Sequence, residues 1–167
     1  MAAYVYYRLK KAGYRAELVG EAAREIIYAS NPGSKPGPLV DNQILLAGLQ
    51  HERVMRLERH RVQIAISDSP VIQNLMYCMY HPYFEDLLET MKKALGGWDT
   101  YNVLIRPNPG YFDPESRMQT TEDEARALDA HVRRLMGEFW LEVGWDQEEL
   151  LAERVLDLLS HLISLPS

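Results

Sequence analysis

The stretch "VQIAISDSP", Val62 to Pro70, places an acid and two turn-forming residues directly after an apolar, β-branched run. A continuous apolar run that stops at turn residues is typical of a strand buried on both faces, as in a parallel sheet covered by helices. We therefore predict a strand over residues 62–67. Asp68 then stands at the carboxyl end of that strand, which is the edge where open α/β sheets bind ligands.

The rest of the chain alternates between strand and helix patterns. Further strands are predicted over residues 15–20, 101–105 and 139–143, from short apolar runs between turn signals. Helices are predicted between them, over residues 2–12, 21–29, 40–59, 71–80, 82–95 and 121–137. Strands that alternate with helices predict one domain of three layers, in which a mostly parallel sheet is flanked by helices.

Two helix starts and two loops are marked by particular residues. Thr121 and Glu124 form a capping-box pattern, and Asp146 is predicted to cap a last helix. That helix carries an apolar stripe at helical spacing: Leu150, Leu151, Val155, Leu158, Leu159 and Leu162. Proline and glycine predict loops over residues 30–38 and 106–119. A loop as long as 106–119 inside a compact domain is often a functional lid.

Composition limits the classes of function. The chain has 167 residues, 47% of them hydrophobic, which is enough for one domain with a substantial core. Its 24 acids and 18 lysines and arginines give a net charge of −6, so we expect no bulk nucleic-acid partner, although a local basic pocket is compatible with that charge. One cysteine, Cys78, and the lack of a secretory or membrane-spanning pattern predict a cytoplasmic protein without a membrane partner.

Three segments resemble one protein family. They are "YRLKKAGYRAELVGEAAREI" near the start, "IAISDSP" at the strand above, and "SRMQTTEDEARALDAHVRRL" late in the chain. Together they look like the small P-loop kinase-like ATP-binding proteins of bacteriophages, which are similar to ribosylnicotinamide kinase and to nucleoside and nucleotide kinases. The resemblance runs from about Tyr4 to Leu159. It implies a P-loop NTPase-like α/β domain over residues 1–167, with residues 106–119 as its lid.

The resemblance also implies roles for single residues. Asp68 would bind Mg²⁺, Glu21 would act as base or substrate ligand, and Arg117 would be the lid cation on the transferred phosphoryl group. Substrate contacts would come from four more polar side chains, namely Arg24, Arg106, Gln119 and Arg126. The implied reaction is transfer of the γ-phosphoryl group of ATP to a nucleoside, nucleotide or similar hydroxyl.

One part of the family pattern is missing from this chain. No Gly-rich phosphate loop of the form G-x-x-G-x-G-K-[ST], and no strand before it, precedes the first helix. Such a loop surrounds phosphates with backbone N–H groups, while its lysine and hydroxyl serve the terminal phosphate and Mg²⁺. We therefore expect weak or no affinity for ATP and Mg²⁺. The alternative function is an inactive binding or interaction module, for which an unpaired sheet edge would favour self-association.

Each candidate residue also has a purely structural interpretation. Asp68 could cap the helix after Pro70, and Glu21 is an acid of the kind that the first turn of any helix favours. Arg24 could pair with Glu21 at i, i+3 spacing, and Arg106 could pair with an acid. For the cations of the helix at 121–137, a solvated helix face is the simpler interpretation: Arg126, Arg133 and Arg134.

Overall fold

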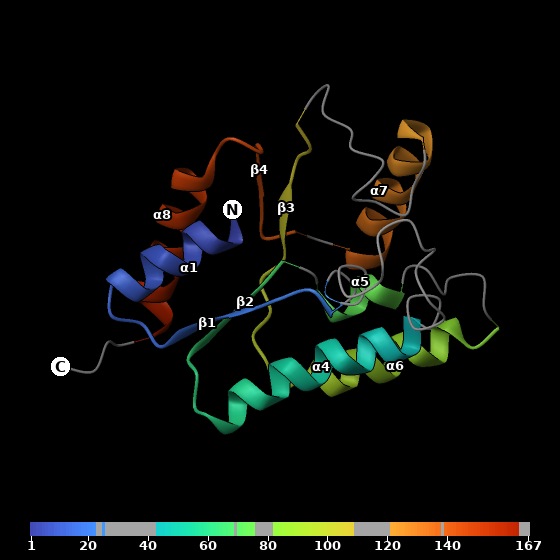
Figure 1. The fold of residues 1–167 in the computed structure, drawn as a ribbon, viewed down its shortest axis with the longest axis horizontal. Helices are drawn as coiled ribbons and strands as arrows, with labels where there is room; N and C mark the ends of the chain where they lie inside the picture. Colours follow the sequence, from blue (N-terminus) through green and yellow to red (C-terminus); the bar gives the residue numbers. More distant parts are fainter. Residues whose placement is uncertain are drawn as a thin grey trace.

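The computed structural model describes residues 1–22, 25, 43–68, 70–75, 82–108, 121–137 and 139–163. About 61% of these residues are helical. Figure 1 shows the arrangement of the helices and strands. In chain order they are α1 (Ala2–Lys11), β1 (Ala16–Val19), α4 (Gln43–Arg59), β2 (Ile64–Ser67), α5 (Val71–Leu75), α6 (Phe84–Leu95), β3 (Val103–Ile105), α7 (Glu122–Met136), β4 (Leu141–Val143) and α8 (Glu148–Leu162).

The prediction of one three-layer P-loop-like domain with a continuous parallel sheet is wrong. The four predicted strands all form, but they make two separate two-stranded sheets, β1–β2 and β3–β4. Within the described residues no ladder joins β2 to β3. The alternation of strand and helix patterns along the sequence predicts which residues are extended and favours parallel pairing of the strands. It does not show whether two neighbouring strand pairs join into one sheet. Strands of three or four residues leave the helices to supply most of the packing.

Each strand pair is parallel and in defined register. In β1–β2, Ala16 lies opposite Ile64 and Val19 lies opposite Ser67. In β3–β4, Val103 pairs with Leu141. Because the strands of each pair run the same way, their carboxyl ends meet at one edge. The residues that follow β1 and β2 are therefore brought together, although they are far apart in the chain.

The main core lies where α1 and α8 pack on the strands. Figure 1 shows these two helices side by side, and their buried side chains share one cluster with residues of β1 and β4. Its fully or nearly buried members are Val5, Leu9, Tyr14, Ala16, Val143, Leu151, Ala152 and Leu159. A second, smaller cluster joins α4 to α5 through Ala47, Val71 and Leu75, with α6 against it.

The predicted helix ends are confirmed in one case and wrong in another. At the start of α7, the Glu124 N–H donates to Thr121 Oγ1 and the Thr121 N–H donates to Glu124 Oε2, so the capping box is confirmed. At α8 the cap position is Gln147 rather than Asp146. Gln147 Oε1 instead accepts a hydrogen bond from the Gly144 N–H at 2.6 Å.

The apolar stripe predicted on the last helix is only partly buried. Leu151 and Leu159 lie in the main core, whereas Leu150 and Leu162 are exposed. Among the described residues, none of the helices has the length and apolar character that crossing a bilayer requires. The predicted loop at 30–38 and Cys78 lie outside the described residues.

Candidate functional site

The carboxyl ends of β1 and β2 bring two of the predicted site residues to one edge. Val19 ends β1 opposite Ser67, the last residue of β2. Asp68 follows Ser67 directly, and Glu21 follows Val19 after a single glycine. Asp68 is exposed and Glu21 is half-buried, so both carboxylates stand at the surface of this edge. The register of the two strands therefore brings Asp68 and Glu21 to the same edge.

A buried glutamine from α4 holds the two strand ends together. Gln50 is fully buried, its Oε1 accepts from the Ala22 N–H at 3.0 Å, and its Nε2 donates to Ser67 Oγ at 3.2 Å. Ala22 is the neighbour of Glu21, and Ser67 is the neighbour of Asp68. The Gln50 side chain thus sets the backbone positions from which both acids project.

An arginine one turn further along α4 secures the segment after β1. Arg53 Nη1 donates to the Gly20 carbonyl oxygen at 2.9 Å and to Glu25 Oε1 at 3.0 Å. Its Nη2 donates to Glu25 Oε2 at 2.6 Å, which completes a bidentate ion pair. A guanidinium that holds both oxygens of a carboxylate also fixes its orientation. Gly20 suits this position because a Cβ there would come within 3.3 Å of Glu25 Oε1.

Another buried amide stands just beyond the edge. Asn74 of α5 is nearly fully buried, and its Nδ2 has no hydrogen-bond partner among the described residues. The Nε2 atom of His51 in α4 is also buried without a hydrogen-bond partner among the described residues, although His51 as a whole is half-buried. Sequence reasoning missed Gln50, Arg53 and Asn74. The one sequence feature that could have indicated them is a polar residue on a helix face whose other residues are apolar and buried.

Arg106 lies at a different place. It follows β3, its backbone N–H donates to the Val143 carbonyl oxygen at 2.8 Å, and its side chain is exposed. The carboxyl end of β3 lies well away from the carboxyl ends of β1 and β2 (Figure 1). Arg106 instead lines a cavity of about 290 Å³ with Trp145 and with Asp129 and Arg133 of α7.

The remaining predicted residues divide into two groups. Arg126 is exposed on α7, as are Arg133 and Arg134, and Arg133 pairs with Glu142 of β4 at 3.0 Å. These positions agree with a solvated helix face. The other three predicted residues, Arg24, Arg117 and Gln119, lie outside the described residues.

The part of the chain that the structure describes contains no cluster of three or more His, Cys, Asp or Glu side chains placed to hold a metal ion. Asp68 is a suitable oxygen ligand for Mg²⁺, but it contributes one carboxylate. Mg²⁺ sites with one or two carboxylates commonly take further ligands from substrate phosphates and water. The described residues therefore fit Mg²⁺ only as a partner of a bound phosphate, with Asp68 as the protein ligand.

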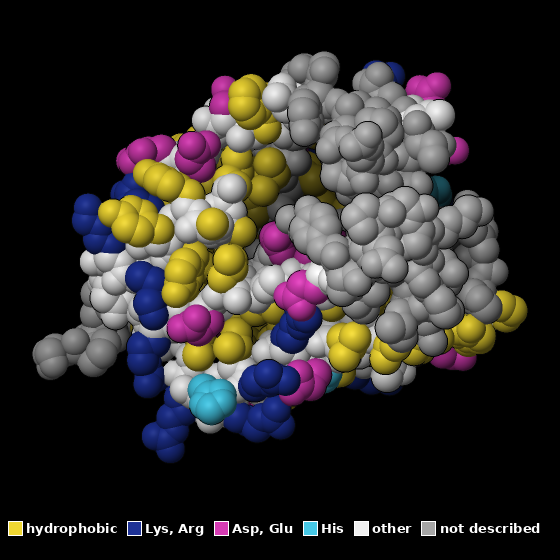
Figure 2. All heavy atoms as spheres, in the orientation of Figure 1, with side chains coloured by type: hydrophobic (Ala, Val, Ile, Leu, Met, Phe, Trp, Pro, Cys, Tyr) yellow, Lys and Arg dark blue, Asp and Glu magenta, His cyan; other side chains and the backbone are white. Residues whose placement is uncertain are grey.

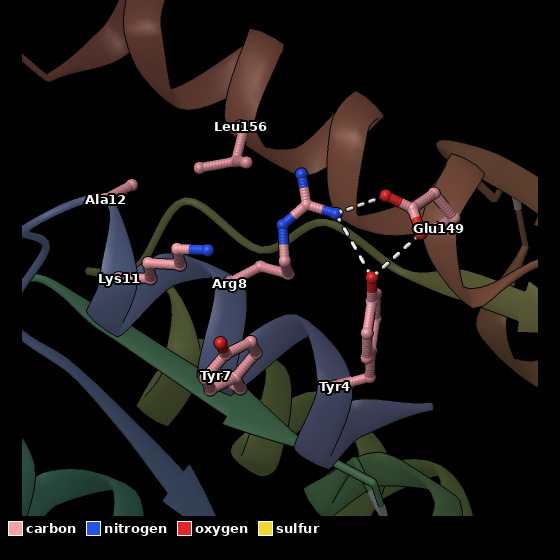
Figure 3. A pocket seen from close by; sticks show the side chains of 7 residues that line it. All are labelled: Tyr4, Tyr7, Arg8, Lys11, Ala12, Glu149 and Leu156. Carbon is pink, nitrogen blue, oxygen red and sulfur yellow. Dashed lines mark hydrogen bonds and ion pairs between the residues drawn. The ribbon is translucent and has the colours of Figure 1, made fainter.

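Another cavity lies between α1 and α8. It measures about 450 Å³ and is lined by Tyr4, Tyr7, Arg8, Lys11, Ala12, Glu149 and Leu156. Figure 3 shows the polar triad at its side. Arg8 Nη1 donates to Glu149 Oε1 at 2.6 Å and to the Tyr4 hydroxyl at 3.2 Å, and that hydroxyl donates to Glu149 Oε2 at 2.9 Å.

The triad shifts the pKa values of Glu149 and Arg8. The hydrogen bond from Tyr4, with Arg8 next in importance, holds the pKa of the Glu149 carboxyl below its usual range. The same contacts raise the pKa of the Arg8 guanidinium above its ordinary value. Both groups therefore stay ionised across the neutral range, and the ion pair between α1 and α8 is intact there.

The lowered pKa of Glu149 predicts a specific acid sensitivity. Because the carboxyl is more acidic in the folded than in the unfolded protein, its stabilisation is complete above the unfolded pKa of about 4.3 and is lost as the pH falls through the lower folded value. We expect the free energy of unfolding to fall less steeply in Glu149→Gln than in the unaltered protein over this acid range. Denaturant unfolding at a series of pH values measures it.

The neighbouring Glu148→Gln change is the matched control, because the exposed Glu148 side chain makes no hydrogen bond or ion pair within the described residues. Its unfolding free energy should follow the unaltered protein at every pH. If Glu149→Gln also follows that curve, the contact does not link folding to protonation.

Comparisons with protein-family models, with curated proteins and with solved structures gave no match. No family model, curated protein or solved structure therefore supports the kinase-like resemblance of the three sequence segments.

Proposed function

We propose that this protein binds a nucleoside or nucleotide at the carboxyl edge of β1 and β2, with Asp68 and Glu21 as its polar ligands. The observation that carries the proposal is the parallel pairing of Val19 with Ser67, which brings these two acids to one edge. Ligands of parallel sheets bind at this edge, and acids there commonly accept hydrogen bonds from ribose hydroxyls.

The charge of this edge favours the sugar over the phosphates. Ionised carboxylates only accept hydrogen bonds, whereas the neighbouring hydroxyls of a ribose can donate to two of them. A carboxylate offers no N–H or O–H donor to a phosphate, so neither acid can bind one directly. The ligand orientation proposed is therefore one in which the ribose faces Asp68 and Glu21 and any phosphate points away from them.

Phosphoryl transfer from ATP is the reaction that the resemblance implies for this edge. In that reaction Glu21 would accept the proton of the acceptor hydroxyl, Asp68 would hold Mg²⁺, and Arg117 would contact the transferred group. Phosphates need donors that surround them, and the chain carries no Gly-rich loop of the required form. We therefore propose acceptor binding as the function of this chain and expect weak or no binding of ATP and Mg²⁺.

Calorimetric titration with a panel of ribonucleosides and their monophosphates tests the proposal. At least one of them should bind, and Asp68→Asn and Glu21→Gln should each weaken it at least about tenfold, as expected for a lost hydrogen bond to a charged group. The 2′-deoxy form of the same ligand should bind more weakly. Asp146→Asn is the matched control, because Asp146 is an exposed acid just after the other strand pair.

The proposal would be wrong if no member of the panel bound, or if Asp146→Asn weakened binding as much as Asp68→Asn. A separate titration with ATP and Mg²⁺ tests the expectation about the donor. Micromolar binding that Asp68→Ala abolishes would overturn it.

A second candidate, an interaction module without catalysis, is favoured by the aromatic side chains around β3–β4. Tyr101, Trp140 and Trp145 are all exposed, and Tyr101 and Trp140 pack edge to face with ring centroids 5.8 Å apart. Exposed Tyr and Trp are typical of protein interfaces. The absence of any nucleoside binding, together with self-association in sedimentation experiments, would favour this candidate.

A further inference from the structure

The 450 Å³ cavity between α1 and α8 is lined by cationic and apolar side chains that are not part of the proposed nucleoside site. It lies at the start and end of the described chain, on the two helices that cover the main core. We propose that this cavity binds an organic phosphate whose body is aromatic or apolar. The cations are Arg8 and Lys11, and the apolar wall is formed by Tyr7 and Leu156.

Arg8 is oriented by the triad but retains unused donors. A guanidinium has five N–H donors, and the two contacts to Glu149 and Tyr4 both come from Nη1. In Figure 3 the other terminal nitrogen points away from Glu149, and it makes no hydrogen bond within the described residues. Arg8 is thus held in place by one nitrogen while the rest of its planar donor set remains available, which suits a phosphate.

Lys11 supplies a second cation from the next turn of α1. Its side chain extends toward Arg8 in Figure 3, and its amino group has no ion pair among the residues that the structure describes. Two cations that face one cavity repel each other, and an anion between them would relieve that repulsion. Because Arg8 is paired with Glu149, the lining as a whole carries one net positive charge, which attracts a phosphate.

The remaining wall explains why the ligand should have an apolar body. The side chain of Tyr7 is 56% exposed, which is the highest exposure among the large hydrophobic side chains of the described residues. Leu156 of α8 lies across the cavity from α1 (Figure 3). An aromatic ring placed on Tyr7 would bury apolar surface that is otherwise in water.

The net charge of the residues that line this cavity is opposite in sign to the net charge of the whole chain. The protein has a net charge of −6, and Figure 2 shows basic and hydrophobic side chains side by side at its left, with acidic side chains among them. Glu149 is the one acid of the cavity, and its charge is already compensated by Arg8 and Tyr4. The lining therefore carries a net positive charge in an otherwise acidic molecule.

Phenyl phosphate is the probe for this site, followed by ¹H–¹⁵N NMR titration of the full chain. It should shift the amide signals around Lys11 and around Leu156, and benzyl alcohol at the same concentrations should not. Lys11→Gln should weaken binding about two- to fivefold, the range for one exposed charge pair. Tyr7→Ala should weaken phenyl phosphate but leave the weaker binding of inorganic phosphate unchanged.

Two controls separate this site from general attraction and from the nucleoside site. Lys92→Gln removes an exposed lysine from the last turn of α6, as Lys11→Gln does in α1, and should leave the affinity unchanged. Asp68→Asn should also leave it unchanged. The proposal is overturned if phenyl phosphate shifts no amides of α1 and α8, or if Lys92→Gln weakens binding as much as Lys11→Gln.

Discussion

Replacing Leu9 with alanine is expected to lower the free energy of unfolding by about 2–5 kcal/mol, the range for large-to-small changes in a core. Leu9 is 0% exposed and lies in the cluster that joins α1, α8 and the strands. Alanine would lose the transfer free energy of the removed methyl and methylene groups and would leave a cavity. Because domains of this size are stable by only about 5–15 kcal/mol, the loss is large. Denaturant unfolding measures it.

Leu162→Ala is the matched control for this experiment. Leu162 lies on α8, near the same core, but its side chain is 51% exposed. The same chemical change should therefore alter the unfolding free energy by less than about 1 kcal/mol. Equal losses in the two variants would contradict the placement of Leu9 in the core.

Replacing Gln50 with methionine is expected to lower the free energy of unfolding by about 1–3 kcal/mol, although the side chain keeps its length. The change removes the acceptor of the buried Ala22 N–H and the donor to Ser67. Burying a polar group without its partner costs more than an average hydrogen bond contributes. Since Gln50 also sets the positions of the backbone beside Glu21 and Asp68, nucleoside binding should weaken in the same variant.

Gln63→Met provides the comparison that isolates burial. Gln63 Oε1 accepts from the Arg15 N–H at 2.9 Å, so this glutamine joins the amino ends of β1 and β2 as Gln50 joins their carboxyl ends. The contact of Gln63 is exposed to water, which can replace the lost acceptor. A loss of less than about 1 kcal/mol is therefore expected at this position. Losses that are equal at positions 50 and 63 would show that the Gln50 hydrogen bonds are not specially important.

The local structure of this chain could be predicted well from particular residues. The apolar runs at residues 62–67 and 101–105 contain the observed strands β2 and β3, and Thr121 with Glu124 begins α7 as expected. These features depend on side chains within a few positions of one another. The wrong cap at α8 has the same local origin, because Asp146 and Gln147 are both polar and only the geometry of the turn selects between them.

The candidate site could be predicted from the sequence only in part. Asp68 and Glu21 each follow a predicted strand, and parallel pairing was sufficient to bring them to one edge. Arg106 also follows a strand, yet its strand belongs to the other sheet, so it lines a different cavity. Gln50 and Arg53 could not be assigned to the edge, because their role depends on which face of α4 packs against β1 and β2.

By itself the amino-acid sequence determined where the described strands and most of the described helices lie, and that an acid follows each of the first two strands. Only the tertiary structure decided that the strands remain in two separate pairs, that Gln50 is buried between two strand ends, and that Arg8 and Lys11 share a cavity. The physical reason for this division is the sequence separation over which each interaction acts. Propensity and periodicity act over a few residues, whereas strand order and side-chain partners depend on contacts between segments tens of residues apart.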